Sequence, residues 1–311
     1  MRIVATVAAG LVLGLGVLQA QSGTSILFVG NSFTFGSGSA VRFYRAQTVT
    51  DLNSEGIGGV PALFKSFTDQ AGLAYDVSLE TRGGSGLDFH LENKLGVLGR
   101  RPWDIVVMHG QSTLDFDKPG DPAKLVATSR QMADFLRARN PKVEIHLMAT
   151  WSRADQTYPV KGAWAGKPIE AMASDVRAAN NLAAAGAPGV TSVIPVGEAW
   201  TRAMQTGVAD PNPYDGIASG RVNLWTYDHY HASTHGYYLE ALVIFGRLTG
   251  RDPRSLGENE CSGYELGLPR TDVKALQQVA FDQLAATGTV TPAPLVLPKP
   301  VAPERCAPAA R

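Results

Sequence analysis

Residues 26–36 read Ile-Leu-Phe-Val-Gly-Asn-Ser-Phe-Thr-Phe-Gly and carry the clearest structural pattern of this chain. Its first half is a short run of large apolar residues, which is typical of a strand buried on both faces of a parallel sheet. The run stops at Gly30-Asn31-Ser32, so we expect Ser32 at the carboxyl end of the strand, where open α/β folds place their chemistry. A serine at such a turn also suits a helix N-cap, and Ser32 alone does not decide between nucleophile and cap.

The same alternation of elements continues along the chain. Apolar runs predict strands at 25–29, 75–79, 104–108, 144–148 and 190–196. Helical patterns fall at 60–71, 87–98, 122–139, 169–185 and 237–248. Strands separated by helices indicate parallel βαβ units. We therefore expect an α/β three-layer sandwich with a mainly parallel, flavodoxin-like sheet of five strands.

Composition excludes several functional classes. The chain has 311 residues, 44% of them hydrophobic, and a formal net charge of zero. Such a chain has ample apolar material for a core, and it carries no basic run of the kind that binds nucleic acid or an anionic membrane. Nucleic acids and anionic membranes are therefore not expected among its partners.

The N-terminus has the pattern of an export signal. Arg2 precedes an apolar run over 3–18, and Leu18-Gln-Ala20 resembles a signal-peptidase site. The alternative is an uncleaved membrane anchor, for which the run is short and rich in glycine. We expect residues 1–20 to be a signal peptide, which predicts a secreted or periplasmic protein with no stable membrane insertion after its removal. Residues 21–288 would then form one domain, followed by a Pro/Ala-rich tail at 289–311.

Both cysteines lie near the C-terminus, at Cys261 and Cys306. An even pair in an exported protein usually forms a disulfide, whereas two free thiols are less common outside the cell. A bond between them would close a loop of about 45 residues and tether the tail, stabilising the fold by ~4 kcal/mol in the chain-entropy model.

A second motif appears about two hundred residues after Ser32, at Asp228-His229-Tyr230-His231. The carboxylate of Asp228 lies three residues before His231, close enough to hold its imidazole. A serine hydroxyl is a weak nucleophile that needs a base within hydrogen-bond reach, and the base is in turn oriented by a third group. The two motifs together favour an acyl-transfer hydrolase.

These motifs resemble the first and last blocks of the SGNH hydrolases, also called the GDSL esterase/lipase superfamily, with Asn31 replacing the usual Asp. The resemblance implies that Ser32 is the nucleophile, His231 the general base and then acid, and Asp228 the carboxylate that fixes the imidazole tautomer. It also implies a ping-pong acyl-enzyme cycle without a cofactor. The run from His231 to Leu239 is similar to the family's run into its closing helix.

The two middle blocks of the family are matched less closely. Thr81-Arg-Gly-Gly-Ser-Gly stands where the family's second block supplies an oxyanion-hole N–H, for which Gly84 is our candidate and Gly86 its competitor. Both glycines also suit a tight turn without any further role. Gln111 stands where the third block has an Asn, and it offers the same amide donor one methylene further out. The variant resembles an SGNH subgroup, known as a domain of unknown function, that favours Gln-Ser here.

Three other residues are candidates for substrate binding, namely Asn31, Trp151 and Arg153. Trp151 and Arg153 follow the strand expected at 144–148, where an aromatic ring and a cation could bind a sugar or a carboxylate, although a Trp more often packs in a core. His229, His231 and His235 are spaced closely enough for metal ligands, but no acidic or thiol cluster accompanies them beyond Asp228. We therefore expect no metal site.

Sequence reasoning thus predicts a secreted serine ester hydrolase that acts on an acyl or acetyl ester. One alternative is a polysaccharide acetylesterase with the same triad, which export and the aromatic residues of the loops favour. Another is a non-catalytic glycan-binding protein that keeps the fold, which the departures at Asn31 and Gln111 favour.

Overall fold

The structure is a computed structural model that describes residues 23–290 and 306. The expected signal peptide at 1–20 lies outside the described residues, as does the expected tail apart from residues 289, 290 and 306. None of the helices in the described part of the chain is both long and apolar enough to span a bilayer.

Within residues 23–290, six strands form one sheet in the order β2-β3-β1-β4-β5-β6. All of the neighbouring strands pair in parallel. Their bounds are β1 (Thr24–Gly30), β2 (Thr50–Asp51), β3 (Tyr75–Thr81), β4 (Ile105–Met108), β5 (Glu144–Ala149) and β6 (Val190–Pro195). The expected α/β fold is confirmed, with one strand more than the five predicted.

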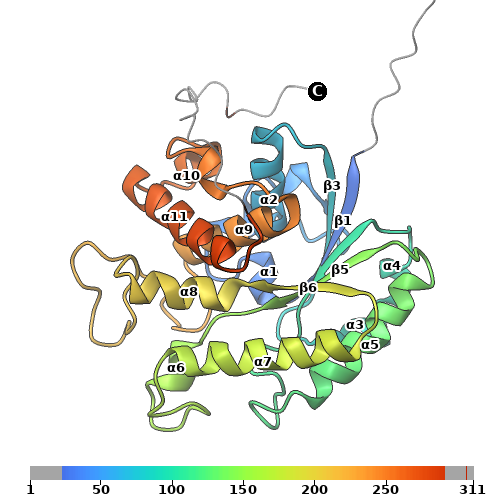
Figure 1. The fold of residues 1–311 in the computed structure, drawn as a ribbon, viewed down its shortest axis with the longest axis horizontal. Helices are drawn as coiled ribbons and strands as arrows, with labels where there is room; N and C mark the ends of the chain where they lie inside the picture. Colours follow the sequence, from blue (N-terminus) through green and yellow to red (C-terminus); the bar gives the residue numbers. More distant parts are fainter. Residues whose placement is uncertain (1–22, 291–305, 307–311) are drawn as a thin grey trace, which may run out of the picture.

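Helices cover both faces of this sheet (Figure 1). The α-helices are α1 (Ser32–Phe35), α2 (Gly59–Gln70), α3 (Leu87–Asn93), α4 (Leu95–Leu98), α5 (Ala123–Arg137), α6 (Ala154–Thr157), α7 (Glu170–Gly186), α8 (Val196–Gln205), α9 (Thr234–Thr249), α10 (Cys261–Glu265) and α11 (Arg270–Ala286). Short 3₁₀ helices are η1 (Ala40–Phe43), η2 (Ala46–Thr48) and η3 (Pro253–Leu256). Helices α2, α8, α9 and α11 cover one face, whereas α3, α5 and α7 cover the other.

Strand β1 shows why the sheet is buried on both faces. Ile26 and Phe28 belong to the core beneath α2 and α9, whereas Leu27 and Val29 belong to the core beneath α5 and α7. Successive side chains of a strand point to opposite faces, so a continuous apolar run is required where helices cover both. The run at the start of residues 26–36 therefore occupies the centre of the fold.

Three element predictions need correction. The strand expected at 190–196 ends at Pro195, and Val196 begins α8, which we did not predict. The single helix expected at 87–98 is two helices that meet at Lys94, whose backbone (φ −126°, ψ 5°) is not helical. Strand β2 and helix α11 were also missed, β2 because two partly exposed residues at a sheet edge carry no apolar pattern.

The predicted disulfide between Cys261 and Cys306 is present, with Cα atoms 5.2 Å apart. Cys261 begins α10, where its backbone N–H donates to Gln70 Oε1 of α2 at 2.9 Å. Arg45 contacts the Cys306 carbonyl and Glu265 of α10. The bond thus attaches Cys306 to a surface formed by α2, α10 and the segment around Arg45.

Breaking this disulfide should destabilise the protein. We expect Cys306→Ser to lower the free energy of unfolding by about 2–4 kcal/mol, because the bond restricts the unfolded chain across a long loop. Urea denaturation with and without a reductant measures the effect. The reductant should not change the Cys261→Ser/Cys306→Ser double variant, and equal midpoints for reduced and oxidised wild type would contradict the expectation.

Candidate functional site

The candidate site lies at the carboxyl ends of the central strands. Strands β3, β1, β4 and β5 are neighbours in the sheet and all run in the same direction. Their following loops therefore meet at one edge, where ligands bind in open α/β folds. Ser32, Gly84, Gln111 and Arg153 all belong to these four loops.

Ser32 is the first residue of α1, and Asn31 is its N-cap. Asn31 Oδ1 accepts a hydrogen bond from the Phe33 N–H at 3.1 Å, so the capping role considered for Ser32 belongs to its neighbour. Among the described residues, neither the hydroxyl nor the backbone N–H of Ser32 makes a hydrogen bond. Both groups of Ser32 are therefore available to a substrate.

The Asn31 amide holds the neighbouring loops together. Its Nδ2 donates to the Ser85 carbonyl at 2.8 Å and to the Gly110 carbonyl at 3.3 Å. Both N–H groups of this amide are thus used by backbone carbonyls. Asn31 was expected to bind substrate, and the structure gives its amide a bridging role between the loops after β1, β3 and β4 instead.

The candidate oxyanion residues lie on two of these loops. Gly84 has a positive φ of 73°, which glycine adopts without strain, and its carbonyl accepts from Gln111 Nε2 at 2.6 Å. Gly86 is the N-cap of α3. In the described part of the chain the backbone N–H groups of Gly84 and Gly86 make no hydrogen bond, so both remain candidates. The Gln111 amide has a second N–H that Gly84 does not use.

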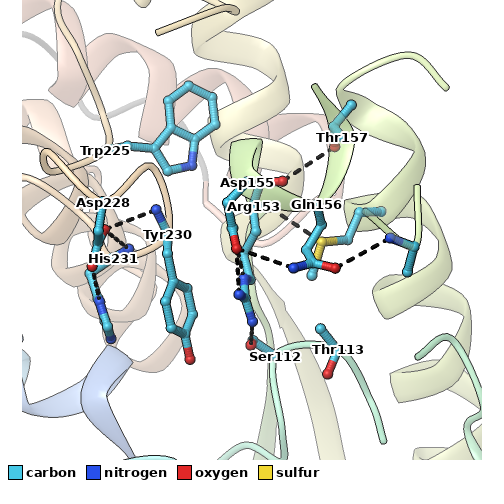
Figure 2. A network of polar contacts seen from close by, with 12 residues as sticks. Ser112, Thr113, Arg153, Asp155, Gln156, Thr157, Trp225, Asp228, Tyr230 and His231 are labelled. Carbon is cyan, nitrogen blue, oxygen red and sulfur yellow. Dashed lines mark hydrogen bonds and ion pairs between the residues drawn. The ribbon is translucent and has the colours of Figure 1, made fainter. Parts of the chain in front are cut away.

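Asp228 holds His231 as the spacing predicted. Asp228 Oδ2 lies 2.6 Å from His231 Nδ1, the geometry of a strong charge-assisted hydrogen bond. Its other oxygen, Oδ1, accepts from Thr226 Oγ1 at 2.7 Å and from the backbone N–H groups of Tyr230 and His231 at 2.9 Å. These contacts fix the carboxylate and leave His231 Nε2 directed away from it (Figure 2).

The same contacts determine the ionisation of Asp228. Burial opposes the charged form, but hydrogen bonds from His231, Thr226 and two backbone N–H groups outweigh it and lower the pKa of Asp228 to about 2. Asp228 is therefore a carboxylate over the whole neutral range, and it favours the tautomer of His231 with a proton on Nδ1.

The loop that carries this pair is a tight hairpin. The Thr226 N–H donates to the His231 carbonyl at 2.8 Å, and Trp225 pairs with Ala232 in an isolated antiparallel bridge. His229 at its tip has a positive φ of 54°. Ser233 then caps α9 by accepting from the Gly236 N–H at 3.3 Å. The Asp–His pair is thus ordered mainly by local contacts.

Aromatic packing joins the Ser32 turn to this hairpin. The Phe33 ring lies edge-on to His231 with centroids 5.9 Å apart, and Tyr237 Oη of α9 donates to the Ser32 carbonyl at 3.1 Å. No hydrogen bond among the described residues joins Ser32 Oγ to His231. The two predicted halves of the triad are therefore brought to adjoining segments, and their direct contact stays a prediction.

Comparisons with known proteins bear on the fold. No protein-family model and no curated protein matches the chain. A DUF4886 family protein from Bacteroides uniformis has a similar structure, with 17% identity, a TM-score of 0.52, and coverage of 86% of this chain and 96% of that one. Axe2, an acetylxylan esterase from Geobacillus stearothermophilus, is 16% identical with a TM-score of 0.49, and the match covers 72% of this chain and 93% of Axe2. The lipase/acylhydrolase from Enterococcus faecalis is 16% identical with a TM-score of 0.46, and the match covers 73% of this chain and 96% of that protein.

The chain shares the overall fold of this DUF4886 family protein, an α/β fold with a parallel sheet covered on both faces. Five of its strands, in the order β3-β1-β4-β5-β6, form the flavodoxin-like part of the sheet, and β2 extends it at one edge. The turn after β1 and the hairpin before α9 occupy the positions that the resemblance assigns to the first and last blocks.

Trp151 does not have the role expected for it from the sequence. Its side chain is fully buried and stacked between Phe33 and Trp200, with ring centroids 4.0 and 4.6 Å away. Its Nε1 donates to the Tyr230 carbonyl at 3.2 Å. The prediction that Trp151 binds substrate is wrong, because its ring supports Phe33 and the His231 hairpin from within the core.

Arg153 connects the third-block loop with the hairpin (Figure 2). Its guanidinium pairs with Asp155 through Nε at 3.0 Å and Nη2 at 2.6 Å, and its Nη1 donates to Ser112 Oγ at 3.2 Å. Its Cζ also lies 3.5 Å from the centre of the Tyr230 ring, a cation–π contact. Asp155 already neutralises the Arg153 guanidinium, so the binding of a substrate carboxylate by Arg153 stays a prediction.

His109 is one of two buried histidines beside the turn that had no partner visible in the sequence. Its Nδ1 lies 3.0 Å from the Gly110 carbonyl and its Nε2 lies 2.9 Å from Thr34 Oγ1. Burial lowers the pKa of His109 to about 4, although the Gly110 carbonyl favours the charged form. A neutral ring that donates to Gly110 and accepts from Thr34 satisfies both contacts. The other buried histidine, His90, pairs with Glu80.

The three histidines near the end of the chain do not converge. His235 Nε2 lies 3.0 Å from Asp272 Oδ2 of α11, whereas the His229 ring packs on Tyr214 at 4.2 Å. In the part of the chain that the structure describes, no group of three His, Cys, Asp or Glu side chains is placed to hold a metal ion.

The depressed pKa of Asp228 predicts a pH-dependent contribution to stability. A carboxyl whose folded pKa lies below its unfolded value of 3.8 stabilises the fold above that value, and the contribution is lost as the pH falls towards about 2. We expect Asp228→Asn to lower the melting temperature at pH 6 and the difference from wild type to shrink between pH 4 and pH 2.

Thermal melts across this range measure the effect. Asp117→Asn, at an exposed carboxylate of the loop after β4, is the matched control and should leave the melting temperature nearly unchanged. A constant difference between Asp228→Asn and wild type at every pH would contradict the expectation.

Proposed function

We propose that this protein is a serine ester hydrolase of the SGNH type, with Ser32 as nucleophile, His231 as general base and Asp228 as the orienting carboxylate. The observation that carries the proposal is the 2.6 Å contact between Asp228 Oδ2 and His231 Nδ1. It lies beside the turn of Ser32, whose hydroxyl makes no hydrogen bond among the described residues. An oriented imidazole next to an uncommitted serine is the arrangement that nucleophilic catalysis requires.

The proposed reaction follows from these positions. With Nδ1 held by Asp228, Nε2 of His231 takes the proton of Ser32 Oγ as that oxygen attacks the ester carbonyl. The tetrahedral oxyanion would be held by the N–H of Ser32, an N–H of Gly84 or Gly86, and the second amide N–H of Gln111. His231 then gives its proton to the leaving alcohol. Water, activated by His231 in turn, releases the acid from the acyl-enzyme.

Export is part of the proposal. The disulfide between Cys261 and Cys306 supports an oxidising compartment, and the segment 1–20 has a signal-peptide pattern. The chemistry needs no cofactor. The partner would be a small-molecule or carbohydrate ester.

Ser32→Ala tests the reaction class. We expect this variant to hydrolyse p-nitrophenyl acetate at less than about a thousandth of the wild-type kcat, since the attacking oxygen is lost while the fold is kept. A fluorophosphonate probe should label wild type on Ser32 and should not label the variant.

Thr34→Ser, two residues further along α1, keeps its hydroxyl and is the matched control. Unchanged hydrolysis by Ser32→Ala would exclude Ser32 as nucleophile, and wild type that neither labels nor hydrolyses but binds glycans would favour the non-catalytic alternative.

Two exposed aromatic side chains favour a carbohydrate ester as the substrate. Tyr227, which precedes Asp228, is 87% exposed, and Tyr214 is 47% exposed and packs on His229 of the same hairpin. Solvent-exposed aromatic rings beside a site give sugar rings an apolar face to stack on. An acetylated polysaccharide is thus the second candidate within the same reaction class.

A substrate panel separates the two candidates. We expect Tyr227→Ala to raise KM for acetylated xylan or pectin by about three- to tenfold with little change for p-nitrophenyl acetate, because only the polymer reaches the exposed ring. Phe43→Ala, at an exposed aromatic of η1, is the comparison variant. A preference of wild type for long-chain nitrophenyl esters over both acetyl substrates would contradict the carbohydrate candidate.

A further inference from the structure

A second carboxylate–imidazole pair lies buried beside the Ser32 turn. Glu80, near the end of β3, and His90, on α3, are both 0% exposed, and His90 Nδ1 contacts Glu80 Oε2 directly. Neither residue takes part in the proposed reaction. Two ionisable side chains buried together are costly unless they are paired and hydrogen-bonded, so their contacts indicate what they do.

Glu80 is held as a carboxylate. Burial raises its pKa, but the hydrogen bond and charge of His90, an amide hydrogen bond from Asn53 and the charge of Lys94 outweigh burial, so the pKa of Glu80 lies below its ordinary value. Asn53 Nδ2 donates to Glu80 Oε1 at 3.1 Å, and Lys94 Nζ lies 3.5 Å from the same oxygen. His90 Nδ1 therefore faces an ionised acceptor and carries a proton.

The other nitrogen of His90 also faces acceptors. Nε2 lies 3.1 Å from the Gly30 carbonyl and 3.3 Å from Ser85 Oγ. The Ser85 hydroxyl donates its own proton to the Arg82 carbonyl at 2.8 Å, so its oxygen can only accept from His90. Both ring nitrogens of His90 thus lie against hydrogen-bond acceptors, and the ring links Glu80 to Gly30 and Ser85.

The His90 ring connects the two loops that would hold the oxyanion. Gly30 lies two residues before Ser32, and Ser85 directly follows Gly84. The Gly30 carbonyl also accepts from the Arg82 N–H at 3.0 Å, and the Ser85 carbonyl accepts from Asn31 at 2.8 Å. A fully buried ring that contacts Glu80, Gly30 and Ser85 has little freedom to move, so it fixes the two loops relative to each other.

We propose that Glu80 and His90 are positioning residues that set the distance between the N–H groups of Ser32 and of the Gly84–Gly86 loop. The inference rests on the proposed function, since it assigns these N–H groups to an oxyanion. Glu80 orients His90, and His90 holds Gly30 and Ser85 in register. Loss of the pair would let the β3–α3 loop move relative to the nucleophile turn, and small displacements of oxyanion donors reduce the rate of the chemical step more than they reduce binding.

The test is the Glu80→Gln/His90→Gln double variant, which replaces the pair by neutral amides of similar volume and leaves no buried charge unpaired. We expect kcat for p-nitrophenyl acetate and the rate of fluorophosphonate labelling to fall about 10- to 100-fold, with KM changed less than about twofold. His146→Gln, at a buried histidine of β5 bonded to Ser192, is the matched control and should keep wild-type kcat. A folded double variant with wild-type kcat would overturn the inference.

Ser85→Ala keeps the test decisive if the double variant does not fold. It removes one acceptor of His90 Nε2 from a partly exposed loop, and we expect kcat to fall about three- to tenfold at constant KM. Wild-type kcat in this variant would overturn the link between His90 and the oxyanion loop. If wild type and His146→Gln are both inactive and unlabelled, the proposed function fails. If wild type is active and the Glu80→Gln/His90→Gln and Ser85→Ala variants are equally active, only the positioning role of Glu80 and His90 fails.

Discussion

The close packing around Gly30 is the constraint on which the candidate site depends. A side chain at this position would collide with Thr34 Oγ1 and with the ring of His109. Because Gly30 has none, β1 can end tightly between β3 and β4, and its carbonyl accepts hydrogen bonds from the Arg82 N–H at 3.0 Å and from His90 Nε2 at 3.1 Å. The turn that presents Ser32 is therefore anchored on both sides by the buried framework of the sheet.

The other half of the site is ordered separately. The Asp228–His231 pair belongs to a hairpin with its own bridge and its own capped helix, and it reaches the Ser32 turn through an aromatic stack of Phe33, Trp151 and Trp200. Apolar packing between rigid aromatic rings thus decides how the two halves face each other. The ionisable side chains described around them have partners within the protein, Asp228 with His231, Arg153 with Asp155 and Glu80 with His90.

Much of the fold could be predicted because its central strands must be apolar on both faces. The run at β1 alternates between two cores and reads as a buried strand without further information. Strand β2 has only Thr50 and Asp51 at a sheet edge and owes its conformation to pairing with β3, so no local pattern could indicate it. Similarly, Val196 is apolar like the strand before it, and only its packing in the core beneath α9 makes it the start of a helix.

For the site, local spacing predicted the features that depend on neighbours along the chain. Asp228 lies three residues before His231 in the same hairpin, and at that separation its carboxylate can reach the Nδ1 atom of His231. The features that join distant loops could not be predicted in this way: the buried position of Trp151, and the pairing of Glu80 with His90 under the Ser32 turn. The physical reason is that burial and pairing between segments depend on which loops meet at the edge of the sheet, and that meeting follows from strand order and core packing, which no local spacing encodes.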